Sequence, residues 1–147
     1  TQVGYIFALI GIIAILVQVK LISLVTAKFG EYKTLFWSLL ILALGFGTIS
    51  LATSIPIFII GNALIPLGNS LANPTLTAIA TENIPKEEYG ESLGLLQSSG
   101  ALGRIFGPVI AGEIYYKFSH TTPMLVSSLI ILFVALAIVP KLRTKNA

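Results

Sequence analysis

Long apolar runs separated by short polar segments form the main pattern of this chain. No ionisable residue lies between Lys33 and Glu82, and the turn signal ATSIP (52–56) divides this stretch in two. A helix needs about 20 apolar residues to cross the hydrocarbon core of a bilayer. The pattern therefore predicts an all-α integral membrane protein with five transmembrane helices. Their expected positions are approximately residues 3–26, 34–53, 56–80, 91–116 and 122–140.

Basic residues gather on one side of this predicted bundle. The other side receives Lys117 alone. Lys and Arg near the ends of membrane helices mark the cytoplasmic side. We therefore expect a cytoplasmic C-terminus and an external Thr1, and a chain that starts outside in this way is expected to lack upstream helices. The residues on the predicted cytoplasmic side are Lys28, Lys33, Lys86, Lys141, Arg143 and Lys145.

Composition agrees with a membrane environment. The chain is 55% hydrophobic and 10% charged, whereas a soluble domain carries roughly 25% charged residues. The small basic excess lies at segment ends, so it does not indicate nucleic-acid binding. The absence of cysteine leaves the redox compartment open, and no signal peptide is expected.

Polar residues on the third predicted helix recur on one face. Asn62, Asn69, Asn73 and Thr77 fall within an arc of roughly 80°, and Pro66 lies in the same arc. This stripe has two interpretations: hydrogen bonds between helices, or the wall of a water-filled cavity. Pro66 and Pro74 interrupt the hydrogen-bond ladder, and broken backbone at this depth is tolerated beside protein or water. The second and fifth helices have no ionisable or amide side chain and are expected to face lipid almost all round.

The fourth predicted helix carries a ridge of small residues. We call this set, which recurs every four residues, the small-residue ridge. Close backbone approach drives helix association in lipid, so the ridge predicts a tight contact with another helix. Pro108 is expected to bend the helix just beyond it. The ridge consists of Ser99, Gly103, Gly107 and Ala111.

Arg104 lies in the middle of the same helix and shares a face with Gln97. An arginine at this depth costs about 2.5–3.5 kcal/mol and stays charged. Glu113 lies about 180° round the helix and is expected to pair with Lys117 instead. Arg104 therefore needs water, a substrate or another part of the protein. Either a functional role or a fixed ion pair or carbonyl contact is compatible with the sequence.

Other polar residues give weaker signals. Lys20, with Gln18 nearby, either extends to the membrane interface or faces the cavity. His120 lies among threonines in a predicted outer loop and is expected to be solvated. No arrangement of His, Cys or carboxylates predicts an enzyme, a metal site or a cofactor, and GRIFG follows no strand, so it is not a nucleotide motif.

The stretch LGRIFGPVIAG (102–112) resembles the eleventh helix of major facilitator superfamily transporters, in the drug:proton antiporter branch related to tetracycline exporters. Gly103, Gly107, Pro108 and Gly112 match the echo of the motif GxxxGPxxGG, and Ala111 replaces one glycine. The segment AKFGEYK (27–33) is similar to a decayed copy of the loop motif between helices eight and nine. Lys28, Gly30 and Lys33 fit this motif. Ser23, Ala27 and Glu31 depart from it, which argues against a gating role for this loop.

The resemblance implies that the chain is a partial C-terminal half of a twelve-helix major facilitator fold, covering helices eight to twelve. Helices eight, ten and eleven would border the cavity, and nine and twelve would face lipid. It implies a proton-coupled transporter of the plasma (bacterial inner) membrane that exports a small molecule by alternating access. The missing N-terminal helices would hold the proton-coupling acids. A sugar or organic-anion uptake carrier and a non-transporting helical scaffold are the alternatives.

Overall fold

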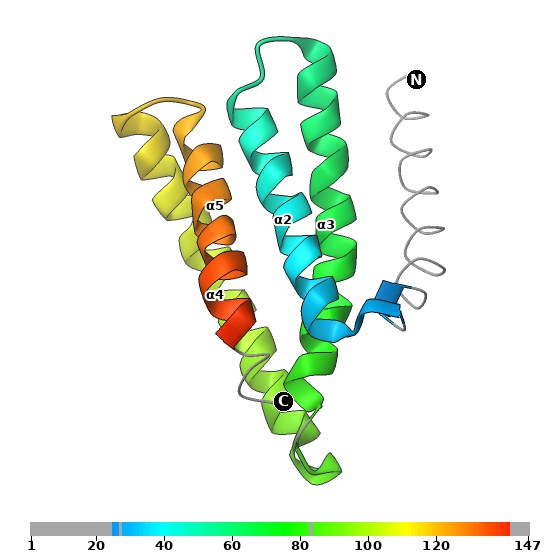
Figure 1. Cartoon of the computed structure of the whole chain (residues 1–147). Coiled ribbons are helices and arrows are strands. Elements are labelled where there is room, and N and C mark those ends of the chain that lie inside the picture. The colour runs from blue at the N-terminus through cyan, green and yellow to red at the C-terminus, as the bar shows by residue number, and fades with distance from the viewer. Residues whose placement is uncertain (1–24, 27, 83, 142–147) are drawn as a thin grey trace, which may run out of the picture.

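The computed structural model describes residues 25, 26, 28–82 and 84–141 (Figure 1). These residues form helices and no strand, which confirms the all-α prediction for the part of the chain described. Three helices in this part are long and apolar enough to cross a membrane: α2, α3, and the stretch Thr122–Lys141 that begins with α5. The elements are α2 (Glu31–Ser50), α3 (Ile55–Thr81), the 3₁₀ turn η1 (Lys86–Glu88), α4 (Tyr89–Lys117), α5 (Thr122–Phe133) and the π-helical η2 (Val134–Ile138).

Local sequence signals explain where these helices begin. Pro56 and Pro123 lie in the first turns of α3 and α5, where a proline loses no helix hydrogen bond. Gly30 precedes α2 with φ of 76°, a conformation that only glycine adopts readily, and its carbonyl accepts the Thr34 hydroxyl at 2.8 Å. Helix α3 continues without interruption through Pro66 and Pro74, although each proline removes one N–H from the ladder.

Helices α2 and α3 make the closest contact. A Cβ added to Gly68 would lie 2.8 Å from both the Leu42 nitrogen and the Ser38 carbonyl oxygen. Gly45 and Gly61 are equally confined, since the Cβ of each would come within 3.2 Å of backbone atoms across the interface. Glycine allows this approach because it carries no side chain, and the two backbones pack directly on each other.

Helix α5 packs on another side of α2 through hydroxyl groups. Ser128 donates a hydrogen bond to the Ala43 carbonyl at 2.7 Å, and Ser50 of α2 donates to the Thr121 carbonyl at 3.2 Å. Near the other end, Leu35, Ala72 and Val139 form a small core shared by α2, α3 and the segment after η2. Helix α2 is therefore the centre of the described bundle.

The packing of α2 corrects one expectation from the sequence. Helix α2 does not face lipid almost all round, because α3 and α5 cover two of its sides and Thr34, Leu35 and Ser38 are buried. The expectation was based on the absence of ionisable and amide side chains from residues 34–53. Helix packing in lipid is directed instead by Gly, Ser and Thr, which α2 does contain. Trp37 and Leu44 remain exposed on the side left open.

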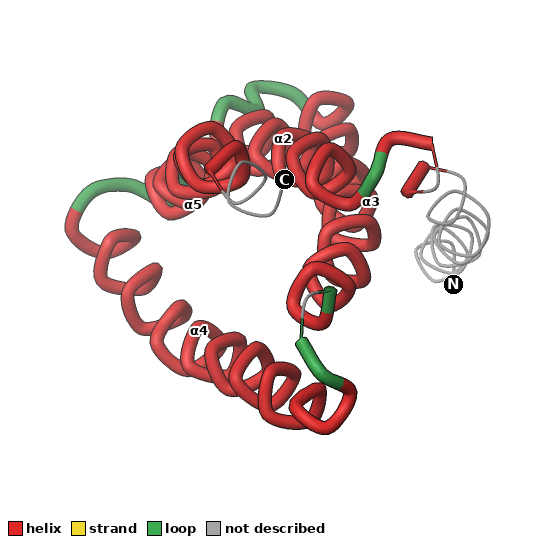
Figure 2. Tube along the Cα trace, turned by 60° about the horizontal axis from the view of Figure 1, so that its bottom comes forward, coloured by secondary structure: helices red, strands yellow, loops and turns green. Residues whose placement is uncertain are grey.

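Helix α4 stands apart from the other helices (Figure 2). It has no buried residue. It meets α3 near its start, where Ser92 donates to the Ala80 carbonyl at 2.6 Å, and approaches α5 near its end. Helix α4 has 29 residues and is long enough to cross a membrane. Its serines, glycines and charged residues make it less apolar than the three membrane-spanning candidates, so it is not one of them. The five-helix membrane arrangement therefore stays a prediction.

Candidate functional site

The polar stripe of α3 lies on the side of the helix away from α2. Asn62, Asn69 and Asn73 are exposed, whereas Gly61 and Gly68 are buried in the contact with α2. The spacing of these residues separates the centres of the two faces by roughly 110°. Within the described residues, the stripe therefore does not connect α3 to a packed neighbour.

Two of the asparagines form a pair. Asn73 Nδ2 donates to Asn69 Oδ1 at 3.1 Å, one helical turn away. Asn62 Nδ2 donates to the Phe58 carbonyl at 2.9 Å, and Thr77 donates to the Asn73 carbonyl at 3.0 Å. Asn69 Nδ2 and Asn73 Oδ1 have no partner in the described part of the chain. The pair therefore presents an unpaired amide NH2 group and an unpaired amide oxygen side by side, which suits water or an uncharged polar group.

Arg104 and Gln97 are exposed on α4. Neither side chain forms a hydrogen bond or ion pair with the described residues. The nearest feature is local, because a Cβ added to Gly100 would lie 3.5 Å from Arg104 Nη1. The guanidinium therefore curls over its own helix and keeps all its donors available.

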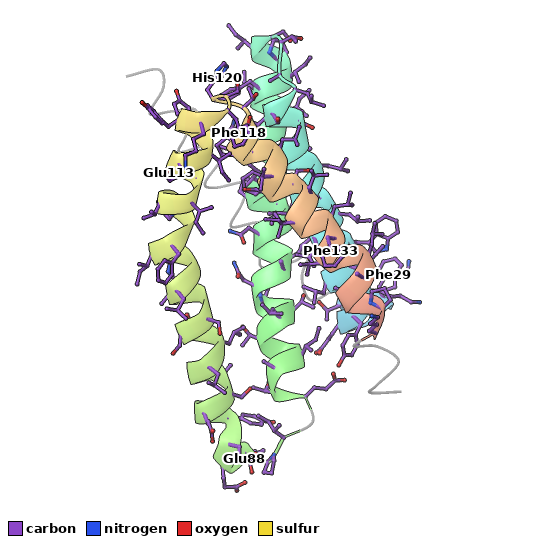
Figure 3. All side chains as sticks on the ribbon, turned by 90° about the vertical axis from the view of Figure 1, so that its left-hand side faces the viewer. Phe29, Glu88, Glu113, Phe118, His120 and Phe133 are labelled. Atoms are coloured by element: carbon purple, nitrogen blue, oxygen red, sulfur yellow. The ribbon has the colours of Figure 1, made fainter. Side chains whose placement is uncertain are left out.

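The predicted pair at the end of α4 is confirmed. Lys117 Nζ lies 2.9 Å from the Glu113 carboxylate. Figure 3 shows Glu113 near the same end of α4 as His120, while Glu88 lies at the opposite end. The side chains of Lys117 and Glu113 are each about two-thirds exposed, so the ion pair contributes little to stability. It also removes Glu113 as a partner for Arg104.

The small-residue ridge meets no helix among the described residues. A Cβ added to Gly103, Gly107 or Gly112 would find nothing within 4 Å. Ser99 donates to its own helix at the Leu95 carbonyl, 2.8 Å away, and Ala111 is half-buried. Helix α4 continues through Pro108. The tight contact expected at this ridge stays a prediction about a partner outside the described residues.

The segment that resembles a loop motif lies at the start of α2. Lys33 is exposed, and Lys28 Nζ lies 5.8 Å from the centre of the Phe29 ring. Sequence reasoning missed the contact beside it, in which the Tyr32 hydroxyl donates to Glu82 Oε2 at 2.9 Å. This bond ties the start of α2 to the end of α3. Tyr32 and Glu82 are 50 residues apart, and no local sequence pattern indicates a contact over that separation.

A second missed feature is a cavity between the two short loops at the other end. It has a volume of about 530 Å³, and its lining includes Ser54, Phe58, His120 and Met124. His120 is exposed at its edge. The sequence identified both loops but contained no signal that they meet. Gln18 and Lys20, proposed from the sequence as cavity residues, lie outside the described residues, and those described contain no cluster suited to a metal ion.

Comparison with known proteins gives a consistent result. The family model described as Major Facilitator Superfamily matches residues 1–147. An MFS-type transporter of Methanocaldococcus jannaschii is 27% identical over 81% of this chain and 32% of its own length. The MFS-type transporter YttB of Bacillus subtilis is 26% identical over 86% of this chain and 32% of its own length. The chain thus spans about a third of these curated relatives. No solved structure matches it.

Proposed function

Because the chain belongs to the Major Facilitator Superfamily, we propose that it forms part of a secondary active transporter that moves a small molecule by alternating access. Its apolar helices make it an integral membrane protein. The relatives bear the name transporter, which favours transport over enzymatic catalysis. The activity is proposed for a protein that contains this chain, since the chain spans about a third of those relatives.

The position of the asparagine stripe carries this proposal. Asn62, Asn69 and Asn73 lie on the exposed side of α3, and a different side of the helix, roughly 110° away, packs on α2 through glycines. In a membrane, exposed amides require water or a polar partner because lipid offers neither. A cavity near the middle of the membrane, where such transporters bind substrate, satisfies this requirement.

Arg104 and Gln97 supply the second wall of the proposed cavity. Within the part of the chain that the structure describes, α4 meets α3 near its start and α5 near its end, and no residue of its middle is buried (Figure 2). An unpaired guanidinium at this depth is costly in lipid and is stabilised by water or an anion. We therefore place the polar faces of α3 and α4 around one water-filled space.

The finer points of the proposal rest on the resemblance of LGRIFGPVIAG to the eleventh helix of antiporters. They are export rather than uptake, coupling to protons, a location in the plasma (bacterial inner) membrane and a cytoplasmic C-terminus. The unpaired Arg104 favours one alternative, an uptake carrier for an organic anion. In that case Arg104→Gln removes binding of anionic substrates and leaves binding of neutral ones unchanged.

Accessibility of introduced cysteines tests the cavity. The chain contains no cysteine, so single cysteines at 69, 73 and 97 report individually on reaction with a membrane-impermeant thiol reagent. Leu44→Cys is the matched control, because Leu44 is 63% exposed but lies on the apolar side of α2. We expect faster labelling at 69 and 97 than at 44, and protection by substrate. Labelling at the control rate at all three sites supports the scaffold alternative instead.

A further inference from the structure

A groove runs along the outer side of α2 and is bounded by α5. Its volume is about 470 Å³. Trp37 and Leu44 of α2 and Leu51, which directly follows the helix, line it at intervals of seven residues, and Leu132 closes it from α5. The spacing places this side of α2 away from the glycine contact with α3. The groove therefore follows nearly the full length of a helix that is apolar enough to cross a membrane.

The groove offers an apolar surface. Its hydroxyl groups are already engaged, because Thr48 donates to the Leu44 carbonyl and Ser128 to the Ala43 carbonyl, each at 2.7 Å. Leu44 and Leu51 are 63% and 72% exposed. The volume equals that of about 16 groups the size of a water molecule, and a methylene is of similar size. A single hydrocarbon chain matches the groove in volume and polarity.

Polar groups stand at one end of the groove. Lys33 lies four residues before Trp37 and hence on the same side of α2. Its ammonium group has no hydrogen-bond or ion-pair partner in the described part of the chain. The indole N–H of Trp37 is also unpaired there, and the ring is set against Phe36 at 5.8 Å between centroids, edge to face. Lys and Trp together are typical of the boundary between hydrocarbon and head groups.

We propose that the groove binds an anionic phospholipid, with one acyl chain along Leu44 and Leu51 and the phosphate at Lys33 and Trp37. Charge complementarity selects this occupant. A hydrocarbon chain fills the apolar part of the groove. An anionic phosphate pairs with the Lys33 ammonium group and accepts a hydrogen bond from the indole N–H of Trp37. A zwitterionic lipid presents the same phosphate but carries no net charge, because its own cation offsets it, so the lysine favours the anionic lipid. The proposal goes beyond transport, because it does not involve the asparagine stripe or Arg104.

The single tryptophan of the 147 residues allows a direct test. The protein is reconstituted in phosphatidylcholine vesicles. Where the chain is part of a longer protein, any tryptophan outside these 147 residues is first replaced by phenylalanine. A minor fraction of the lipid is either brominated phosphatidylglycerol or brominated phosphatidylcholine. Bromine on an acyl chain quenches indole fluorescence on contact. We expect phosphatidylglycerol to occupy the position beside Trp37 about five-fold more often than phosphatidylcholine at equal fractions of the two brominated lipids. This ratio corresponds to ~1 kcal/mol, the contribution of one basic residue near an anionic surface.

Two variants make the test specific. Lys33→Gln is expected to remove the preference while phosphatidylcholine still quenches, since the apolar groove remains. Lys86→Gln, which removes another exposed lysine in η1, is expected to retain the preference. Equal quenching by the two lipids in the unchanged chain overturns the proposal. Quenching by neither lipid also overturns it, because protein then covers the groove, as in a contact with a second copy.

Discussion

Replacing Gly68 by alanine tests the close backbone contact between α2 and α3. The added Cβ would lie 2.8 Å from the Leu42 nitrogen and 2.8 Å from the Ser38 carbonyl oxygen. Real Cβ atoms are essentially never found so close to backbone, and backbone atoms cannot turn aside as a side chain can. Helices α2 and α3 must therefore separate, and the contacts that flank Gly68 must loosen.

The magnitude follows from two opposing effects. Alanine stabilises a helix interior by about 1 kcal/mol relative to glycine. Overpacking a close contact costs about 1–3 kcal/mol, occasionally more. We expect the second effect to dominate at Gly68, because the obstructing atoms are backbone, and the free energy of unfolding to fall by up to about 2 kcal/mol after the helix preference is subtracted. Gly94→Ala is the matched control, since its Cβ would meet nothing within 4 Å and only the helix preference applies.

The measurement is the fraction of purified protein that stays monodisperse in detergent after heating. On the scale of globular proteins, 1 kcal/mol shifts the midpoint by roughly 2–4 °C for a chain of this size. Gly68→Ala should lower the midpoint, and Gly94→Ala should leave it unchanged or raise it. If both variants melt at the same temperature, the α2–α3 approach is wider than described and the reasoning fails.

Three further predictions follow from the contacts above. Ser128→Ala removes the bond to α2 and should destabilise the protein by about 0.6 kcal/mol in the same assay, whereas Ser127→Ala, which loses only a bond within α5 to the Pro123 carbonyl, should have less effect. Gly107→Leu should reduce accumulation in the membrane if the small-residue ridge meets another helix, and normal accumulation argues against that contact. Reporter fusions in 28–33 and 118–121 should report opposite sides of the membrane, and the same side for both contradicts the proposed topology.

The fold was partly accessible from the sequence. Prolines and polar turns marked the starts of α3 and α5 closely, because a proline at a helix start is a local signal. The packing of α2 was predicted wrongly, since the sequence shows which side chains are apolar but not which side of a helix another helix covers. The available signal was Gly45 on α2 together with Gly61 and Gly68, which are seven residues apart and therefore share one face of α3.

The candidate site shows the same division. Periodicity placed Asn62, Asn69 and Asn73 on one face, and the structure places that face away from α2. The Glu113–Lys117 pair was predictable because its spacing within one helix determines it. The Tyr32–Glu82 bond and the cavity beside His120 depend on how distant segments meet, which no local pattern encodes.

The close contact between α2 and α3 also has a consequence for biogenesis. The two helices are consecutive, and only residues 51–54 separate them. Every residue needed for the glycine contact has entered the membrane once α3 is inserted, and the contact needs no residue of α4 or α5. The hairpin can therefore associate during translation as a preformed unit, and contacts so local in sequence form quickly. Helices α4 and α5 then add to a template that is already in place.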